Sequence, residues 1–255
     1  LHEMPFENDG SISWDLMVER YNADLANVLG NLVSRTIAMT NKYFGGVVEK
    51  TTAVFSEEER ALDAEFTETV LTEVKKVREK MDVLRVADAM TELWNIFKRC
   101  NKYIDETLPW ALAKDEAKQD RLKAVLYNLT EALTIGASLL FSFMPETAEK
   151  ILKELNTEKR NLEAMTSFGL YPSGNRVAAE AEMLFRRLDP KEVEAKLNAE
   201  NAAAEEASAE AEKIEEAQAA ADVQIPAKPE VEYDAFAQCE FRVCKVLKCE
   251  EVPKS

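Results

Sequence analysis

The sequence of 255 residues contains one histidine, His2, close to its first residue. Ser-His-Asp and Cys-His catalysis need a positioned imidazole, and histidine-rich metal sites need several, so none of these sites is expected. The phosphate-cradling patterns Gly-x-Gly-x-x-Gly and Gly-x-x-x-x-Gly-Lys are also missing. We therefore expect a binding module with no catalytic residue, no metal site and no cofactor in this chain.

Glycine, proline and cysteine are scarce, with 7, 8 and 4 residues. So few turn-forming residues argue against an all-β sandwich or barrel over most of the chain. Four cysteines do not make a disulfide scaffold and favour a reducing, cytoplasmic location. Cys100 is expected to be structural, and the five-residue spacing of Cys239, Cys244 and Cys249 does not bring three thiols together on a strand or a helix. Long apolar runs are absent, so no membrane-spanning segment is expected.

The formal net charge of −16 is unevenly distributed. The segment from Asp189 to Glu230 holds 12 acidic and 4 basic residues, is rich in alanine and has no aromatic residue. Such a composition is typical of a solvated helix or a semi-rigid linker. The sequence therefore predicts a compact region over 1–188, an acidic Ala/Glu-rich linker over 189–230 and a separate short segment over 231–255. The first residue, Leu1, is not methionine, which favours a fragment of a longer protein.

Residues 1–188 show helical periodicity in about five stretches, so we predict an all-α bundle. Ser13 is suited to cap a helix that starts at Trp14 and ends at Gly45-Gly46. Ser56 and Glu59 form a capping-box pattern, and Asp82 is suited to cap a third helix. A fourth long helix follows Trp110, and Pro145 fits the first position of a short one through Leu155. Residues 163–188 are expected to be an irregular return segment.

Residues 231–255 differ from the rest of the chain. Apolar residues alternate with Arg242 and Lys245, which predicts a strand from about Glu240. Because a single strand cannot bury itself, this segment is expected to be the start of an incomplete β domain.

Four polar residues recur at spacings of three and four on the first predicted helix: Asp24, Asn27, Asn31 and Arg35. The spacing alone favours a solvated helix face. The alternative is a recognition stripe, because amide and guanidinium groups can pair with the edges of nucleic-acid bases. Basic residues that could accompany such a stripe are Arg20, Arg35, Lys42, Lys98, Arg99 and Lys102.

Trp110 directly follows Pro109, just beyond a predicted helix end. One interpretation is that the indole fills the gap between two helices. The other is that proline restrains the turn and presents the indole as a stacking platform for an unstacked base. Trp94, by contrast, lies mid-helix among apolar residues and is expected to be in the core.

Several segments closely resemble bacterial methionyl-tRNA synthetases, from the start of their anticodon-binding bundle onward. The resemblance covers nearly the whole chain in order and is therefore specific. It is carried by Asp9–Trp14, Val18–Asn27, Leu29–Thr36, Asn101–Lys114, Phe143–Ile151 and Phe236–Ser255.

The resemblance implies the helical-bundle anticodon-binding domain of class I aminoacyl-tRNA synthetases, followed by a helical linker and an incomplete OB-fold segment. It also implies that the partner is the CAU anticodon stem-loop of tRNA(Met). The family's stacking tryptophan and the proline before it fall on Trp110 and Pro109. The asparagine and arginine that contact anticodon bases fall on Asn31 and Arg35.

The family's catalytic motifs, His-Ile-Gly-His and Lys-Met-Ser-Lys-Ser, are absent from this sequence. By resemblance, the parent enzyme is a methionine–tRNA ligase that uses ATP, magnesium and zinc in a catalytic domain missing here. We expect this chain alone to be inactive, and to form a homodimer only if the OB-type domain were complete. Neither a membrane nor DNA is an expected partner. The alternative function is a non-catalytic helical structural or interaction module that does not bind tRNA.

Overall fold

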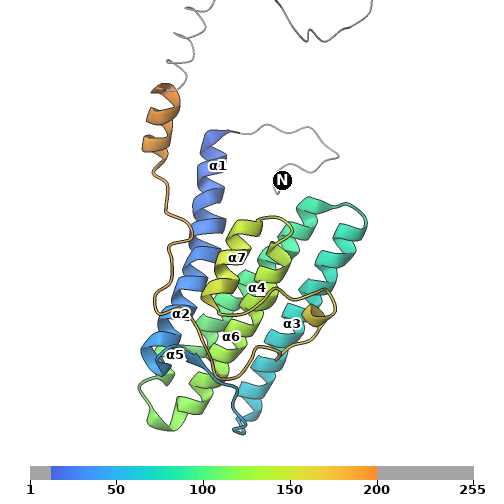
Figure 1. Cartoon of the computed structure of the whole chain (residues 1–255), viewed down its shortest axis with the longest axis vertical. Helices are drawn as coiled ribbons and strands as arrows, with labels where there is room; N and C mark the ends of the chain where they lie inside the picture. The colour runs from blue at the N-terminus through green and yellow to red at the C-terminus, as the bar shows by residue number, and fades with distance from the viewer. Residues whose placement is uncertain (1–12, 200–255) are drawn as a thin grey trace, which may run out of the picture. The chain divides into compact units, whose positions relative to one another are not determined.

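The computed structural model describes residues 13–199, which form a bundle of helices (Figure 1). The predicted β segment 231–255 and most of the predicted linker 189–230 lie outside these residues, so those predictions are untested. Also outside the described part are His2, Cys239, Cys244 and Cys249.

The first helix is continuous but not uniform. It comprises α1 (Trp14–Arg20), η1 (Tyr21–Gly30) and α2 (Asn31–Phe44), and η1 is π-helical. The predicted cap is confirmed, because the hydroxyl of Ser13 accepts a hydrogen bond of 3.2 Å from the Leu16 amide. The predicted end is also confirmed: Gly45 adopts a φ of +59°, and its amide donates to the carbonyl of Asn41 at 3.0 Å.

An antiparallel pair follows, α3 (Glu57–Asp82) and α4 (Val86–Thr107). The Ser56 capping box is confirmed by both of its hydrogen bonds, 3.2 Å from the Glu59 amide and 3.0 Å to the Glu59 carboxylate. The prediction that Asp82 caps α4 is wrong. Asp82 is the last residue of α3, and α4 begins only after a turn in which Leu84 has a φ of +60°.

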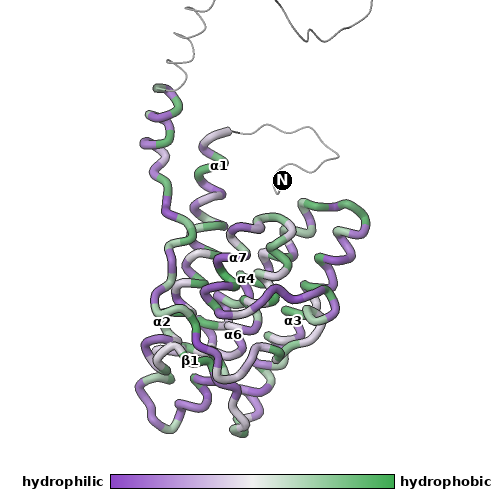
Figure 2. Tube along the Cα trace, viewed as in Figure 1, coloured by the Kyte–Doolittle hydropathy of each residue, from purple (hydrophilic) through white to green (hydrophobic). Residues whose placement is uncertain are grey.

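The second half of the bundle contains α5 (Pro109–Leu112), η2 (Glu116–Lys118), α6 (Gln119–Leu140) and α7 (Pro145–Glu154). Helix α6 is the central element, because it contacts α2, α4 and α7 and is buried along most of its length. The predicted helix at Pro145 is confirmed, with proline in its first turn. Hydrophilic and hydrophobic residues alternate along the outer helices (Figure 2), as expected for helices with one buried face.

Residues after α7 return across the bundle largely without regular structure, as predicted for 163–188. They include a 3₁₀ turn, η3 (Ala164–Thr166), and β2 (Asn175–Arg176), which pairs antiparallel with β1 (Val47–Val48). Residues 178–188, which we call the strap, are fixed to the first helix at both ends. The Asn41 amide donates to the Ala178 carbonyl at 2.7 Å, and the Asn22 side chain bonds both backbone groups of Leu188 at 2.8 and 2.9 Å. Helical backbone resumes over residues 190–199.

The core confirms two single-residue predictions. Trp94 is 6% exposed and packs edge-to-face against Phe97. Cys100 is fully buried, and burial raises the pKa of its thiol to about 12, so it is a structural residue. Within residues 13–199, no helix is long and apolar enough to cross a membrane.

Candidate nucleic-acid interface

Helix α2 has one buried and one exposed face. Its buried residues are Leu32, Val33, Thr36, Ile37 and Thr40. The hydroxyls of Thr36 and Thr40 donate to the carbonyls of Leu32 and Thr36 at 2.9 and 2.8 Å, so burial leaves neither hydroxyl unpaired. Asn31 and Arg35 lie on the exposed face, one helical turn apart.

The predicted polar stripe is only partly formed. Asn27, Asn31 and Arg35 are exposed, whereas Asp24 is half-buried and lies 3.9 Å from Arg20. The π-helical backbone of η1 explains the difference, because its i→i+5 bonding alters the 3.6-residue period on which the stripe was predicted. In the part of the chain that the structure describes, the Arg35 guanidinium has no ion pair or hydrogen bond, so its charge is available to a ligand.

The Pro-Trp turn lies where α4 ends. Leu108 has a φ of +46°, and its carbonyl accepts a hydrogen bond of 2.8 Å from the Ala111 amide. Pro109 is buried as the first residue of α5, while the Trp110 side chain is 42% exposed. The indole therefore neither fills a closed gap nor projects freely, and part of its surface is open to stacking.

Buried hydrogen bonds hold the helix that leads to this turn. Tyr103, in the last turns of α4, donates its hydroxyl to the carboxylate of Asp63 in α3. Arg121 in α6 binds the same carboxylate at 2.6 and 2.9 Å, and Asn128 donates to the Tyr103 hydroxyl at 3.1 Å. The Tyr103 ring also stacks on Phe66, with 4.2 Å between centroids. Residues of two neighbouring helices, α3 and α6, thus fix the end of α4.

Two hydrogen bonds set how α4 lies against the first helix. The Trp94 indole donates to the Asp24 carbonyl at 3.3 Å, and the Asn101 amide donates to the Val28 carbonyl at 3.1 Å. Because residue numbers rise together in the two pairs, the helices run in the same direction. The end of α4 and its Pro-Trp turn therefore lie toward α2, beyond Val28, and α2 and α5 are at the same end of the bundle (Figure 1).

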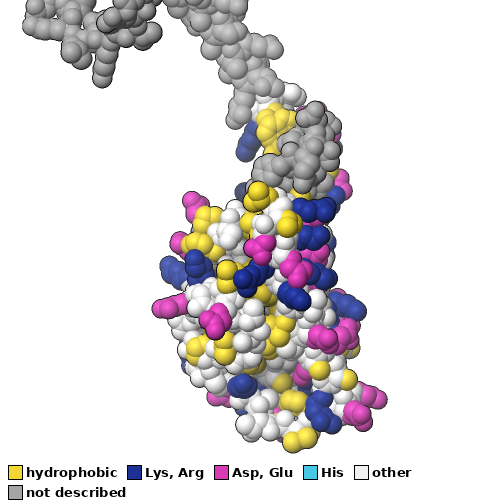
Figure 3. Space-filling model, turned by 90° about the vertical axis from the view of Figure 1, so that its right-hand side faces the viewer, with side chains coloured by type: hydrophobic (Ala, Val, Ile, Leu, Met, Phe, Trp, Pro, Cys, Tyr) yellow, Lys and Arg dark blue, Asp and Glu magenta, His cyan; other side chains and the backbone are white. Residues whose placement is uncertain are grey.

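Not all of the basic residues that were predicted to accompany the polar stripe are free to contact a nucleic acid. Arg99 is only 7% exposed, is paired with Glu106 at 2.9 Å, and lies over the rings of Phe66 and Tyr103. It is therefore a structural cation, and the sequence pattern gave no sign of its burial. Lys42 and Lys98 are exposed. On the face in Figure 3, basic and acidic side chains are interspersed, so this face has no extended basic patch.

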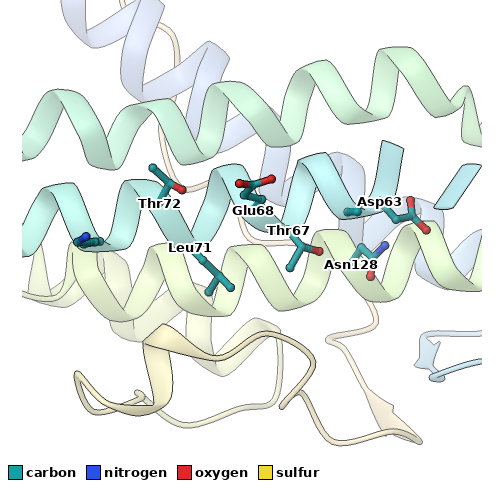
Figure 4. Close-up of a pocket in the computed structure, with 8 residues that line it drawn as sticks. Asp63, Thr67, Glu68, Leu71, Thr72 and Asn128 are labelled. Carbon is teal, nitrogen blue, oxygen red and sulfur yellow. The ribbon is translucent and has the colours of Figure 1, made fainter. Parts of the chain in front are cut away.

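A shallow groove of about 650 Å³ runs between α3 and α6 (Figure 4). Its charged lining residues are Asp63, Glu68 and Lys75, so acidic side chains outnumber basic ones, and threonines and Asn128 complete the polar lining. The carboxylates make it unsuited to a phosphate backbone, and Asp63 and Asn128 already belong to the Tyr103 network. Within residues 13–199, no three His, Cys, Asp or Glu side chains are grouped as a metal site requires.

Comparison with protein families gives two matches. Residues 50–206 match the model described as the anticodon binding domain of methionyl tRNA ligase. Residues 1–37 match the model for class I tRNA synthetases of the methionine type. The first match covers more than half of the chain, including α3 to α7.

Individual proteins agree with these matches. The chain is 40% identical to a methionine–tRNA ligase of Clostridium acetobutylicum over 255 residues, and 37% identical to that of Bacillus subtilis over 262 residues. In each case it spans 37% of the relative's length. A crystal structure of apo Mycobacterium tuberculosis methionyl-tRNA synthetase superposes with a TM-score of 0.67 at 33% identity, covering 74% of this chain and 37% of that one. The chain therefore belongs to the methionyl-tRNA ligase family, and its residues 50–206 match that family's anticodon-binding domain.

Proposed function

We propose that this helical bundle binds the CAU anticodon loop of tRNA(Met). The observation that carries the proposal is a partly exposed indole, Trp110, on the proline-fixed turn of α5, together with two exposed polar residues of α2, Asn31 and Arg35. Helices α2 and α5 lie at the same end of the bundle (Figure 1). Single-stranded loops are recognised by this combination of stacking and hydrogen bonding on base edges.

Each residue has a distinct role in the proposal. Trp110 stacks on an unstacked anticodon base, an interaction typically worth about 1–3 kcal/mol per base. Pro109 restrains the turn, so that less conformational freedom is lost on binding. The Asn31 amide and the Arg35 guanidinium donate hydrogen bonds to base edges, and Asn31 can also accept one. The uncompensated charge of Arg35 further attracts the RNA.

The chain's place in a longer protein is part of the proposal. The matched relatives are methionine–tRNA ligases of which this sequence spans 37%. We assign anticodon recognition to this part, and the ATP-dependent attachment of methionine, with its magnesium and zinc, to the part of the relatives that it does not span. The protein would act in the cytoplasm, and dimer formation would depend on a complete OB-type domain.

A titration with a labelled CAU anticodon stem-loop tests the proposal. Trp110→Ala should weaken binding by about ten- to a hundredfold, as expected for the loss of one stacked base. Trp14→Ala is the matched control, because Trp14 is also exposed, at 56%, but lies at the start of α1. Equal effects of the two substitutions would contradict the proposal and favour a structural or interaction module.

A further inference from the structure

Acidic residues are missing from one stretch of this strongly acidic chain. Asp and Glu make up 48 of its 255 residues, yet residues 25–48 contain none. This stretch covers the end of η1, all of α2 and β1. The exposed side chains of this segment therefore include no carboxylate that would repel a polyanion such as RNA.

Within this stretch, a second cation shares the face of α2 that carries Asn31 and Arg35. Lys42 is two helical turns beyond Arg35, and both are exposed. At 1.5 Å per residue, the two side chains originate about 10 Å apart along the helix. Ala38 lies between them and is also exposed. Because its side chain is only a methyl group, it leaves space above the helix between the two cations.

The contacts of Lys42 leave its charge uncompensated. Its ammonium group lies 5.4 Å from the centroid of the Tyr43 ring, and among the described residues no carboxylate pairs with it. A lysine in the last turn of a helix ordinarily interacts with the helix dipole. That role accounts for a single cation there, but it does not account for a helix without Asp or Glu whose exposed face also carries Arg35 and Asn31.

We propose that Lys42 binds a phosphate of the RNA backbone next to the bases contacted by Asn31 and Arg35, with Ala38 providing the room for the backbone to approach α2. The inference rests on the proposed anticodon binding and adds a positioning contact to it. A phosphate contact sets register and affinity but carries no sequence information. Lys42 should therefore contribute equally to binding of CAU and of altered loops.

The test is a titration of wild-type protein and Lys42→Ala with the CAU stem-loop and with a loop changed at one anticodon base, at 50 and 200 mM salt. One phosphate contact contributes a salt slope of about 0.7–0.9, so wild-type affinity should fall about threefold more than that of Lys42→Ala between these concentrations. Both loops should be weakened by the same factor, and Lys42→Arg should restore most of the affinity. Lys75→Ala, at a lysine that is 77% exposed on α3, is the control and should change neither quantity.

A second variant separates binding from folding. Ala38→Glu places a carboxylate between Arg35 and Lys42, where it can pair with Lys42 at i+4 and support the helix. It should nevertheless weaken binding of both loops by more than Lys42→Ala does. If Lys42→Ala and Ala38→Glu bind like wild type while Trp110→Ala still loses affinity for the CAU loop, the phosphate contact is refuted and anticodon binding stands. If the wild-type protein binds neither loop, the phosphate contact of Lys42 and the proposed anticodon binding are both refuted.

Discussion

The carboxylate of Glu131 in α6 is bound to the guanidinium of Arg160 by two hydrogen bonds of 2.7 Å, and Glu131 has no exposed surface. The same carboxylate accepts the backbone amides of Gly169, Leu170 and Tyr171 at 2.7, 3.0 and 2.7 Å. One buried side chain thus fastens the irregular return segment onto the central helix.

Glu131→Gln should lower the free energy of unfolding by about 3 kcal/mol, because it leaves the nearly buried Arg160 without a counter-charge. Urea unfolding followed by circular dichroism measures the change. Glu149→Gln, at an exposed site on α7, should stay within about 0.5 kcal/mol of wild type. A loss below about 1 kcal/mol for Glu131→Gln would show that the ion pair is not required to hold the segment.

The same carboxylate predicts a pH dependence. Burial acts to raise the pKa of Glu131, but hydrogen bonds from Arg160 and from the Leu170 and Tyr171 amides outweigh it and hold the pKa below 4.5. A group whose pKa is lowered by folding stabilises the protein above its unfolded pKa, and this contribution is lost as the pH falls through the folded value. The stability difference between wild type and Glu131→Gln should therefore shrink as the pH falls below 4.5. A difference that stays constant would contradict this account.

Tyr103→Phe removes the hydrogen bond from α4 to Asp63 while leaving the ring stacked on Phe66. Burial and the Asp63 charge raise the pKa of Tyr103, so the hydroxyl stays protonated and donates. We expect the substitution to cost about 1 kcal/mol of stability, measured by urea unfolding. Tyr43→Phe is the control, because the Tyr43 hydroxyl has no hydrogen bond in the described part. Equal stabilities would show that the network does not anchor the end of α4.

Gly136 in α6 permits a close approach of the Phe97 ring from α4. A Cβ atom at this position would lie 2.5 Å from Cε1 and 3.1 Å from Cζ of Phe97. Gly136→Ala should therefore destabilise the protein by about 1–3 kcal/mol through overpacking. Thermal or urea unfolding measures the effect. In the double variant with Phe97→Leu, the two losses should be less than additive, and strict additivity would exclude the clash as the cause.

Local sequence signals predicted much of the fold. The caps at Ser13 and Ser56, the glycine end after Phe44 and the proline start at Pro145 all depend on a few adjacent residues. The family resemblance indicated Asn31, Arg35, Pro109 and Trp110, and the structure adds that all but Pro109 are exposed.

The features that were missed depend on contacts across the fold. Asp82 is a good capping residue, but the left-handed turn at Leu84 moves the start of α4 to Val86. The burial of Arg99 depends on Phe66, which is distant in sequence. Likewise, the π-helical stretch of η1 and the attachment of the strap to Asn22 have no periodic signature.

Anticodon selectivity is measured most directly as the ratio of two dissociation constants for the wild-type chain. One is for the CAU stem-loop and the other for a stem-loop with a single anticodon base changed. Because a wrong base leaves donors on Asn31 or Arg35 unpaired, we expect the CAU loop to bind at least about tenfold more tightly. This ratio should persist at higher salt, since phosphate contacts weaken both loops alike. Equal dissociation constants for the two loops would contradict selective recognition of the CAU anticodon.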